Sequence, residues 1–193
     1  MSRLPKLIVV SAPSGAGKTT LCQRLLRDFS ELQLSVSSTT RKPRGGEKEG
    51  CEYHFITTDE FRKKIELGLF AEWAEVHGAY YGTSKEVIER AFASGKSVVL
   101  DIDVQGAESL KQAYPGQSVS FFIEPPSLQV LEQRLRDRKT DSEESIQRRL
   151  LNAQNEMTKC NGFDHIIVND TFDHAYNQLK IGVSEALKKV SHG

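Results

Sequence analysis

One short stretch constrains the fold of this chain more than any other feature: the loop at Ala12–Thr19. It follows the phosphate-binding pattern Gly-x-x-x-x-Gly-Lys-Ser/Thr, except that Ala12 stands at the first glycine position. Gly15 and Gly17 allow successive backbone N–H groups to point at a phosphate, and a following helix adds its positive end. Such a loop must connect a strand to a helix. The apolar run at 7–11 and the segment at about 17–29 meet that requirement.

A second Gly-Lys-Ser tripeptide, at 95–97, is predicted to end a helix and not to bind phosphate. It precedes an apolar strand, whereas a P-loop follows one. That strand ends at Asp101 and resembles the Walker B element, which assists a nucleotide-bound Mg²⁺. We therefore expect Lys18 to reach the β- and γ-phosphates of a nucleotide, the Thr19 hydroxyl to ligate Mg²⁺, and Asp101 to assist the metal directly or through water.

Strand and helix patterns alternate outside the middle of the chain. Strands are expected at 97–102, 118–123 and 165–169, and helices at about 104–113 and 128–138. A C-terminal helix is expected to follow the last strand and to end at about 189. The strands are apolar along their length, as parallel strands are when helices cover both faces of the sheet. The sequence therefore predicts an α/β fold of the P-loop NTPase type, with a parallel sheet flanked by helices.

The region from about 35 to 95 has a different character, with a turn at Arg44-Gly45-Gly46-Glu47 and short alternating segments. Two capping boxes, Thr57-x-x-Glu60 and Thr83-x-x-Glu86, predict helix starts. The other ends of these helices are expected near 68 and 95. We interpret this region as a small mixed α+β subdomain inserted into the core.

Composition limits the classes of partner. The 193 residues carry 26 basic and 26 acidic side chains, so there is no bulk attraction to nucleic acid or to a membrane surface. No apolar run approaches the length of a membrane span, and the run at 7–11 is too short for a signal-peptide core. The three scattered cysteines fit reduced thiols, which predicts a cytoplasmic protein.

At this point the chain resembles the guanylate kinase family. The resemblance rests on the P-loop form with Ala12 and on the segments Ser35–Arg44, Glu72–Glu75, Tyr80–Thr83, Leu100–Gly106 and Ile167–Asp170, which occur in the family's order. It implies transfer of the γ-phosphoryl group of ATP to GMP, and also to dGMP, giving ADP and the nucleoside diphosphate. It further implies one domain with a core at 1–34 and 96–193, a GMP-binding subdomain at about 35–95 and a lid at about 136–150.

The resemblance also implies the residues of the GMP site. Glu72 would accept the N1–H and 2-amino hydrogens of guanine together, and adenine offers no such pair of donors. The remaining family positions are hydroxyl contacts to the base, carboxylates near the nucleoside, and an arginine and tyrosine clamp on the phosphate. In this chain they are Ser37, Thr83, Asp101, Asp103, Arg41, Arg44, Tyr53 and Tyr81.

On the ATP side, the resemblance assigns the P-loop, three lid arginines and one asparagine near the adenine. These residues are Ala12, Pro13, Ser14, Gly15, Ala16, Gly17, Lys18, Thr19, Thr20, Arg134, Arg138, Arg149 and Asn169. Family members often have glycine on both sides of the middle arginine, where this chain has Asp137 and Lys139. Arg136 and Arg148 receive no role and are interpreted as solvated helix charges.

Two other hypotheses stay open on the sequence alone. A kinase for another nucleoside monophosphate would share the P-loop and the lid, but would not need Glu72 with Ser37 and Thr83. A non-catalytic peptide-binding module of guanylate-kinase type tends to lose the P-loop lysine and the lid arginines, which are present here. The sequence leaves the oligomeric state open.

Overall fold

Five parallel strands form the central sheet in a computed structural model that describes residues 4–76, 78–137 and 142–188. The strands lie in the order β2 (Leu32–Leu34), β7 (Ser97–Asp101), β1 (Leu7–Ser11), β8 (Ser118–Glu124) and β9 (His165–Val168). In register, Ile8 of β1 lies between Val99 of β7 and Val119 of β8. The predicted parallel sheet is confirmed, although the sequence reasoning did not include the short β2.

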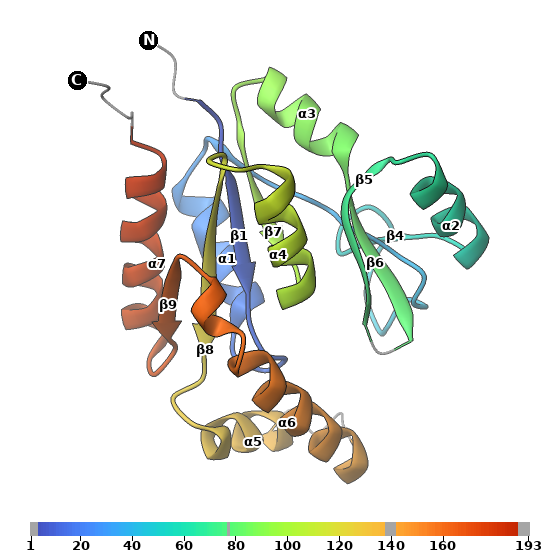
Figure 1. Cartoon of the computed structure of the whole chain (residues 1–193). Helices are drawn as coiled ribbons and strands as arrows, with labels where there is room; N and C mark the ends of the chain where they lie inside the picture. Colours follow the sequence, from blue (N-terminus) through green and yellow to red (C-terminus); the bar gives the residue numbers. More distant parts are fainter. Residues whose placement is uncertain (1–3, 77, 138–141, 189–193) are drawn as a thin grey trace.

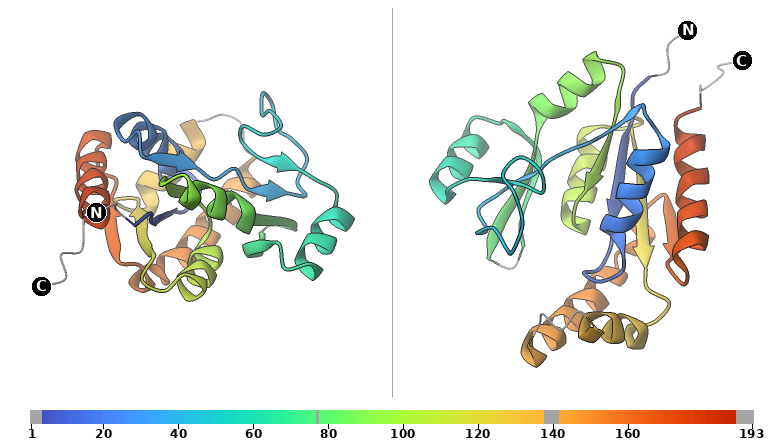
Figure 2. Two further views of the ribbon diagram at one scale, coloured as in Figure 1. Left: turned by 90° about the horizontal axis from the view of Figure 1, so that it is seen from above. Right: turned by 180° about the vertical axis from the view of Figure 1, so that it is seen from behind.

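Helices cover both faces of this sheet (Figures 1 and 2). One face packs against α1 (Lys18–Asp28) and α7 (Phe172–Ala186), the other against α3 (Lys85–Ala93) and α4 (Val104–Ala113). Alternate residues of β1 therefore enter different clusters, Ile8 and Val10 toward the first pair of helices and Leu7 and Val9 toward the second. This double burial is the reason that the strand reads as a continuous apolar run.

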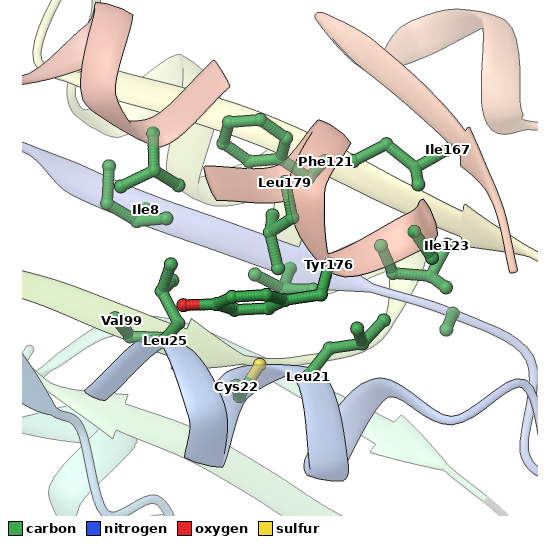
Figure 3. Close-up of a cluster of buried hydrophobic side chains, with 14 of the residues drawn as sticks. Ile8, Leu21, Cys22, Leu25, Val99, Phe121, Ile123, Ile167, Tyr176 and Leu179 are labelled. Carbon is green, nitrogen blue, oxygen red and sulfur yellow. The ribbon is translucent and has the colours of Figure 1, made fainter. Parts of the chain in front are cut away.

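The larger cluster fixes the P-loop from behind. Figure 3 shows Tyr176 and Leu179 of α7 facing Leu21 and Leu25 of α1, with Phe121 of β8 beside them. The methyl group of Ala12 and the side chain of Ala16 belong to the same buried cluster. The P-loop is thus anchored in the main core of the protein at two of its own positions.

A second sheet lies to one side of the first, beyond α3 (Figure 1). Its strands are β4 (His54–Phe55), β3 (Ser38–Thr39), β6 (Ala79–Ser84) and β5 (Phe70–Val76), in that order, and α2 (Thr58–Glu66) packs on it. Phe61 of α2 is fully buried and stacks on Phe70 with ring centroids 4.4 Å apart. A Cβ at Gly82 would lie 3.0 Å from both of these rings, so the close packing of α2 requires a glycine there.

Two helices stand at the carboxyl ends of β1 and β8, below the central sheet in Figure 1. These are α5 (Leu128–Asp137) and α6 (Glu143–Met157), and they share a small buried cluster of Leu131, Leu135, Ile146 and Ala153. A short 3₁₀ turn, Cys160–Gly162, leads from α6 to β9. The sequence reasoning placed a lid here without identifying α6 as a helix of this length.

Two local predictions had opposite outcomes. The capping box at Thr57 and Glu60 is confirmed, because each side chain binds the backbone of the other residue. The capping box at Thr83 is wrong, since Thr83 lies inside β6 and helix α3 begins at Lys85 after Ser84. The Thr83 hydroxyl donates instead to Glu72 across the sheet, and this tertiary contact outweighs the local pattern.

The other elements follow the sequence closely. Gly95 has a φ of 73° between the end of α3 and the start of β7, as expected of a helix stop. Helix α7 ends at Ala186, while Lys189 lies outside the described residues. Within the described ranges, none of the helices has the length and apolar character that crossing a membrane requires.

Candidate active site

A cavity of about 1270 Å³ lies between the P-loop, the second sheet, the carboxyl end of β7 and helix α6. Most of the predicted site residues line it, although they come from distant parts of the chain. These are Ala12, Pro13, Ser14, Gly15, Gly17, Lys18, Thr19, Thr20, Ser37, Arg41, Arg44, Tyr53, Glu72, Tyr81, Asp101, Asp103 and Arg149. The other described residues predicted for the site, Ala16, Thr83, Arg134 and Asn169, do not belong to this lining.

The P-loop takes its shape from backbone conformations that suit glycine. Gly15 and Gly17 have φ values of 102° and 94°, and Gly17 is the residue before the first turn of α1. The loop is braced from outside, because Asn169 donates its side-chain N–H to the Ala16 carbonyl at 2.6 Å. The carbonyl of Asn169 in turn accepts a hydrogen bond from Arg134 at 2.9 Å. Asn169 and Arg134 thus form a support behind the phosphate loop.

Lys18 and Asp101 form an ion pair at the floor of the cavity, with 2.7 Å between Nζ and Oδ1. Lys18 also donates to the Ile102 carbonyl at 3.1 Å. Burial disfavours the charged ammonium, but the Asp101 carboxylate outweighs this effect and raises the pKa of Lys18 above its usual value. Lys18 is therefore a fixed positive charge pointing into the cavity.

The oxygen atoms beside this pair suit a hard cation. The Thr19 hydroxyl lies 3.4 Å from Oδ2 of Asp101, so one hydroxyl and one carboxylate stand together beneath the P-loop. Across residues 4–76, 78–137 and 142–188, no group of three or more His, Cys, Asp or Glu side chains could hold a metal ion. The donor set fits Mg²⁺, which takes one or two protein oxygens and fills its other positions with water and substrate phosphate.

A buried carboxylate faces the cavity from the second sheet. Glu72 is 6% exposed, and its Oε1 accepts the Thr83 hydroxyl at 2.6 Å. Burial raises the pKa of Glu72 to about 7; the Thr83 hydrogen bond opposes this shift, and the neighbouring Asp103 carboxylate adds to it. A buried acid with one remaining open oxygen is prepared to receive N–H donors from a ligand.

The first turn of α4 completes this pocket. Asp103 caps the helix by accepting from the Gly106 N–H at 2.9 Å, and the buried Ser37 also lines the cavity. A Cβ at Gly106 would lie only 2.5 Å from Oε2 of Glu72. The carboxylate can therefore approach the helix only because residue 106 has no side chain.

A cluster of aromatic and basic side chains lines another wall of the cavity. The guanidinium of Arg41 lies 5.2 Å above the ring of Tyr53 and donates from Nε to the Tyr81 hydroxyl at 3.2 Å. Arg41 also forms an ion pair with Glu47 at 2.9 Å. Arg44 lies beside them and lines the same cavity. The structure thus brings the four predicted clamp residues together.

The lid contributes one predicted arginine directly. Arg149 of α6 donates to the Ser14 hydroxyl of the P-loop at 3.1 Å, which closes part of the cavity. Arg148 also lines the cavity, so its interpretation as a solvated charge was incomplete. Arg136 is exposed, pairs with Glu132 of its own helix α5, and links α5 to α6 through Glu143. The predicted Arg138, with Lys139, lies outside the described residues.

Two acidic residues of the cavity were missed by sequence reasoning. Glu47 follows the turn after Arg44, and a turn that brings an acid back to nearby arginines was the available sign. Glu156 belongs to the last turn of α6, and burial raises its pKa to about 7, with Lys18 opposing the shift and Asp103 adding to it. No local pattern distinguishes Glu156 from an ordinary helix charge.

Comparison with known proteins gives a consistent result. The family model described as guanylate kinase matches residues 4–186. A guanylate kinase of Maricaulis maris is 51% identical over 187 residues, which cover 96% of this chain and 86% of the relative. One of Myxococcus xanthus is 47% identical over 175 residues, covering 90% and 83%. The crystal structure of guanylate kinase from Anaplasma phagocytophilum superposes with a TM-score of 0.82 at 31% identity, covering 98% and 89%.

Proposed function

The chain belongs to the guanylate kinase family, an enzyme family that phosphorylates GMP to GDP with ATP, and we propose how the cavity residues divide this work. The main observation in support is that a single cavity is lined both by the P-loop and by Glu72, a buried carboxylate of the second sheet. A phosphate loop and a selective base pocket in one space are what transfer between two nucleotides requires.

On the donor side, the P-loop backbone and Lys18 hold the phosphates of ATP. Lys18 is charged and fixed by Asp101, so phosphate oxygens meet an ammonium that needs no reorganisation. We also propose Mg²⁺ as cofactor, held by Thr19 and by Asp101, directly or through water. When bound, the metal neutralises charge on the phosphates during transfer.

On the acceptor side, Glu72 receives the N1–H and 2-amino hydrogens of guanine. The Thr83 hydroxyl occupies Oε1 and so orients the carboxylate for these bonds. Adenine would leave the buried acid without donors, which is a strong ground for rejection. Ser37, Asp103 and Asp101 are assigned to the nucleoside side of this pocket. We extend the proposal to dGMP, which carries the same base and phosphate.

The GMP phosphate binds the clamp of Arg41, Arg44, Tyr53 and Tyr81, which offers guanidinium forks and phenols to a dianion. An ionised phosphate oxygen of GMP attacks the γ-phosphorus of ATP, so no general base is required. Arg149, which already contacts the P-loop, is proposed to hold the charge on the transferring group together with Arg138. We propose the same role for Arg134, which would have to exchange its hydrogen bond to the Asn169 carbonyl for a phosphate oxygen. Closure of the lid excludes water, which would otherwise accept the phosphoryl group.

Composition supports proposals for the class of ligand and for the cellular location of the enzyme. Equal numbers of acidic and basic residues support a protein that acts on small nucleotides and not on nucleic acid or membranes. Cys22, Cys51 and Cys160 are free thiols, which supports a cytoplasmic location.

The test is acceptor selectivity. The purified protein with ATP and Mg²⁺ should form ADP rapidly with GMP and slowly with AMP, UMP or dTMP as sole acceptor. Comparable turnover with AMP would contradict the assignment of Glu72. Absence of turnover with every acceptor would contradict the enzymatic assignment and favour a binding module. A matched variant, Glu75→Gln, alters an exposed acid on the same strand and should leave selectivity unchanged.

A further inference from the structure

We propose that Glu47 is a positioning residue that orients Arg41 for the acceptor phosphate. The Glu47 carboxylate holds the terminal edge of the Arg41 guanidinium, formed by Nη1 and Nη2, so that the side edge, formed by Nε and Nη2, faces the ligand. This inference rests on the proposed GMP site and adds a residue to the four that the family resemblance places at the phosphate. Glu47 lies on the loop between β3 and β4 and lines the cavity together with Arg41, Arg44, Tyr53 and Tyr81.

The contact between Glu47 and Arg41 is a parallel pair of hydrogen bonds. Nη1 donates to Oε2 at 2.9 Å, and Nη2 donates to Oε1 at 2.9 Å. Nη1 also donates to the Lys42 carbonyl at 2.8 Å, and Nε to the Tyr81 hydroxyl. The carboxylate therefore occupies the terminal edge of the guanidinium. One hydrogen of Nη2, on the side edge shared with Nε, is left for another acceptor.

Aromatic rings fix the plane of the same guanidinium. Its central carbon lies 5.2 Å from the centroid of Tyr53 and 5.9 Å from that of Phe55. The Arg41 side chain is only 12% exposed. With the end held by Glu47 and the plane held by the rings, Arg41 loses little conformational freedom when a phosphate arrives.

Glu47 also fixes the second arginine of the clamp. Its Oε2 accepts the backbone N–H of Arg44 at 2.7 Å, and its own N–H donates to the Arg44 carbonyl at 3.0 Å. Gly45, with a φ of 49°, allows this tight return of the chain. Both arginines lower the pKa of the Glu47 carboxyl, the side chain of Arg41 most strongly, so the acid is charged when the clamp is formed.

The Tyr81 hydroxyl shows where a ligand oxygen fits. This oxygen accepts from Nε of Arg41, so its own hydrogen is directed elsewhere, and the described residues provide no recorded acceptor for it. A phosphate oxygen beside the side edge of Arg41 could receive both the Tyr81 hydrogen and the remaining Nη2 hydrogen. Glu47 does not occupy that position, because it lies at the terminal edge.

If Glu47 instead competed with GMP for Arg41, its removal would have the opposite effect on the affinity for GMP. A carboxylate can imitate a phosphate, and a Glu47 that merely kept Arg41 occupied until GMP displaced it would weaken GMP binding. Its removal would then tighten binding. Removal of a positioning residue loosens Arg41 and weakens binding.

The test is the affinity of Glu47→Gln for GMP and for guanosine, measured by titration calorimetry. GMP should bind about ten- to hundredfold more weakly, because the charge-assisted pair is lost. Guanosine, which has no phosphate, and ATP should bind within about twofold of wild type, whereas general damage to the fold would weaken all three. Unchanged or tighter GMP binding overturns the inference.

Two further variants sharpen this test. Glu49→Gln removes a carboxylate of the same loop that binds His54 and the Phe55 N–H, and it should leave GMP binding unchanged. In an Arg41→Lys background, Glu47→Gln should have a much smaller effect than in the wild type, because the arginine fork is absent and the glutamine oxygen can still accept the Arg44 N–H. Additive losses would overturn the inference. GMP binding can be measured without phosphoryl transfer. A wild-type protein that binds GMP without phosphorylating it would therefore contradict the proposed function but not the role of Glu47.

Discussion

The P-loop and the acceptor side of the cavity solve the same problem, the holding of a nucleotide, by different means. In the proposed function, the P-loop offers main-chain N–H groups from one continuous segment, shaped by Gly15 and Gly17. The proposed acceptor side uses side chains carried by β5, β6 and the loops before and after β3, and two of them have a supporting partner. Glu72 is held by Thr83, and Arg41 by Glu47.

The difference teaches which kinds of change each region tolerates. The geometry of the P-loop is set by backbone conformation and by a buried core that includes Ala12 and Ala16. In the proposed function, Lys18 is the charged side chain that this segment itself contributes. On the acceptor side, affinity is distributed over several side chains, so single substitutions should have smaller and more selective effects.

The largest effect is expected at Lys18. Lys18→Ala should lower kcat about 10³-fold, because no neighbouring group can replace a preorganised charge on the phosphates. The measurement is steady-state ADP formation with saturating GMP. Lys6→Ala is the matched control, since Lys6 binds the Gly116 carbonyl away from the cavity. If Lys18→Ala kept most of its activity, the contrast between the two regions would be lost.

The next effect concerns base selectivity. Glu72→Gln should lower kcat/KM for GMP about 100-fold, since an amide accepts poorly from two adjacent donors and brings a competing N–H group. The kcat/KM for AMP should not fall by the same factor. Steady-state kinetics with both acceptors will show this. A parallel loss with GMP and AMP would mean that Glu72 supports the fold of the pocket and not recognition.

The same substitution should stabilise the free protein at high pH. Because the pKa of Glu72 is raised from 4.5 to about 7, the folded protein binds this proton more tightly than the unfolded chain. Its contribution to the free energy of unfolding therefore falls as pH rises through this window. Glu72→Gln should be more stable than wild type by about 3 kcal/mol at pH 8 and equal to it near pH 4.

Urea unfolding at several pH values measures this difference. The raised pKa of Glu156 affects both proteins equally, so the difference between them isolates Glu72. A difference that does not change with pH would show that Glu72 is ionised in the folded protein at a normal pKa. Burial of the Glu72 carboxylate would then not lower the free energy of unfolding.

A smaller effect is expected at Gly106. Gly106→Ala places a methyl group 2.5 Å from Oε2 of Glu72, so the carboxylate must move from its present position. KM for GMP should rise about tenfold while KM for ATP stays the same. Gly162→Ala, at a position with open space, is the control. An unchanged KM for GMP would show that the pocket adapts more easily than the packing indicates.

The sequence predicted the donor side in detail because its chemistry is local. The pattern around Gly15, Gly17 and Lys18 contains the glycines, the lysine and the helix start within one short segment. The apolar strands likewise revealed a parallel sheet, since burial on both faces leaves a direct trace in composition. The family resemblance then supplied the residues proposed for the acceptor side, but not their contacts.

The contacts were decided by tertiary structure. Thr83 satisfies a local capping pattern, yet the antiparallel pairing of β5 with β6 places it against Glu72. Asn169 reaches the Ala16 carbonyl from the end of β9, far away in sequence. Glu47 reaches Arg41 only because the intervening turn reverses the chain. Side-chain pairs of this kind depend on strand register and close approach, and no local pattern of residue types encodes either of them.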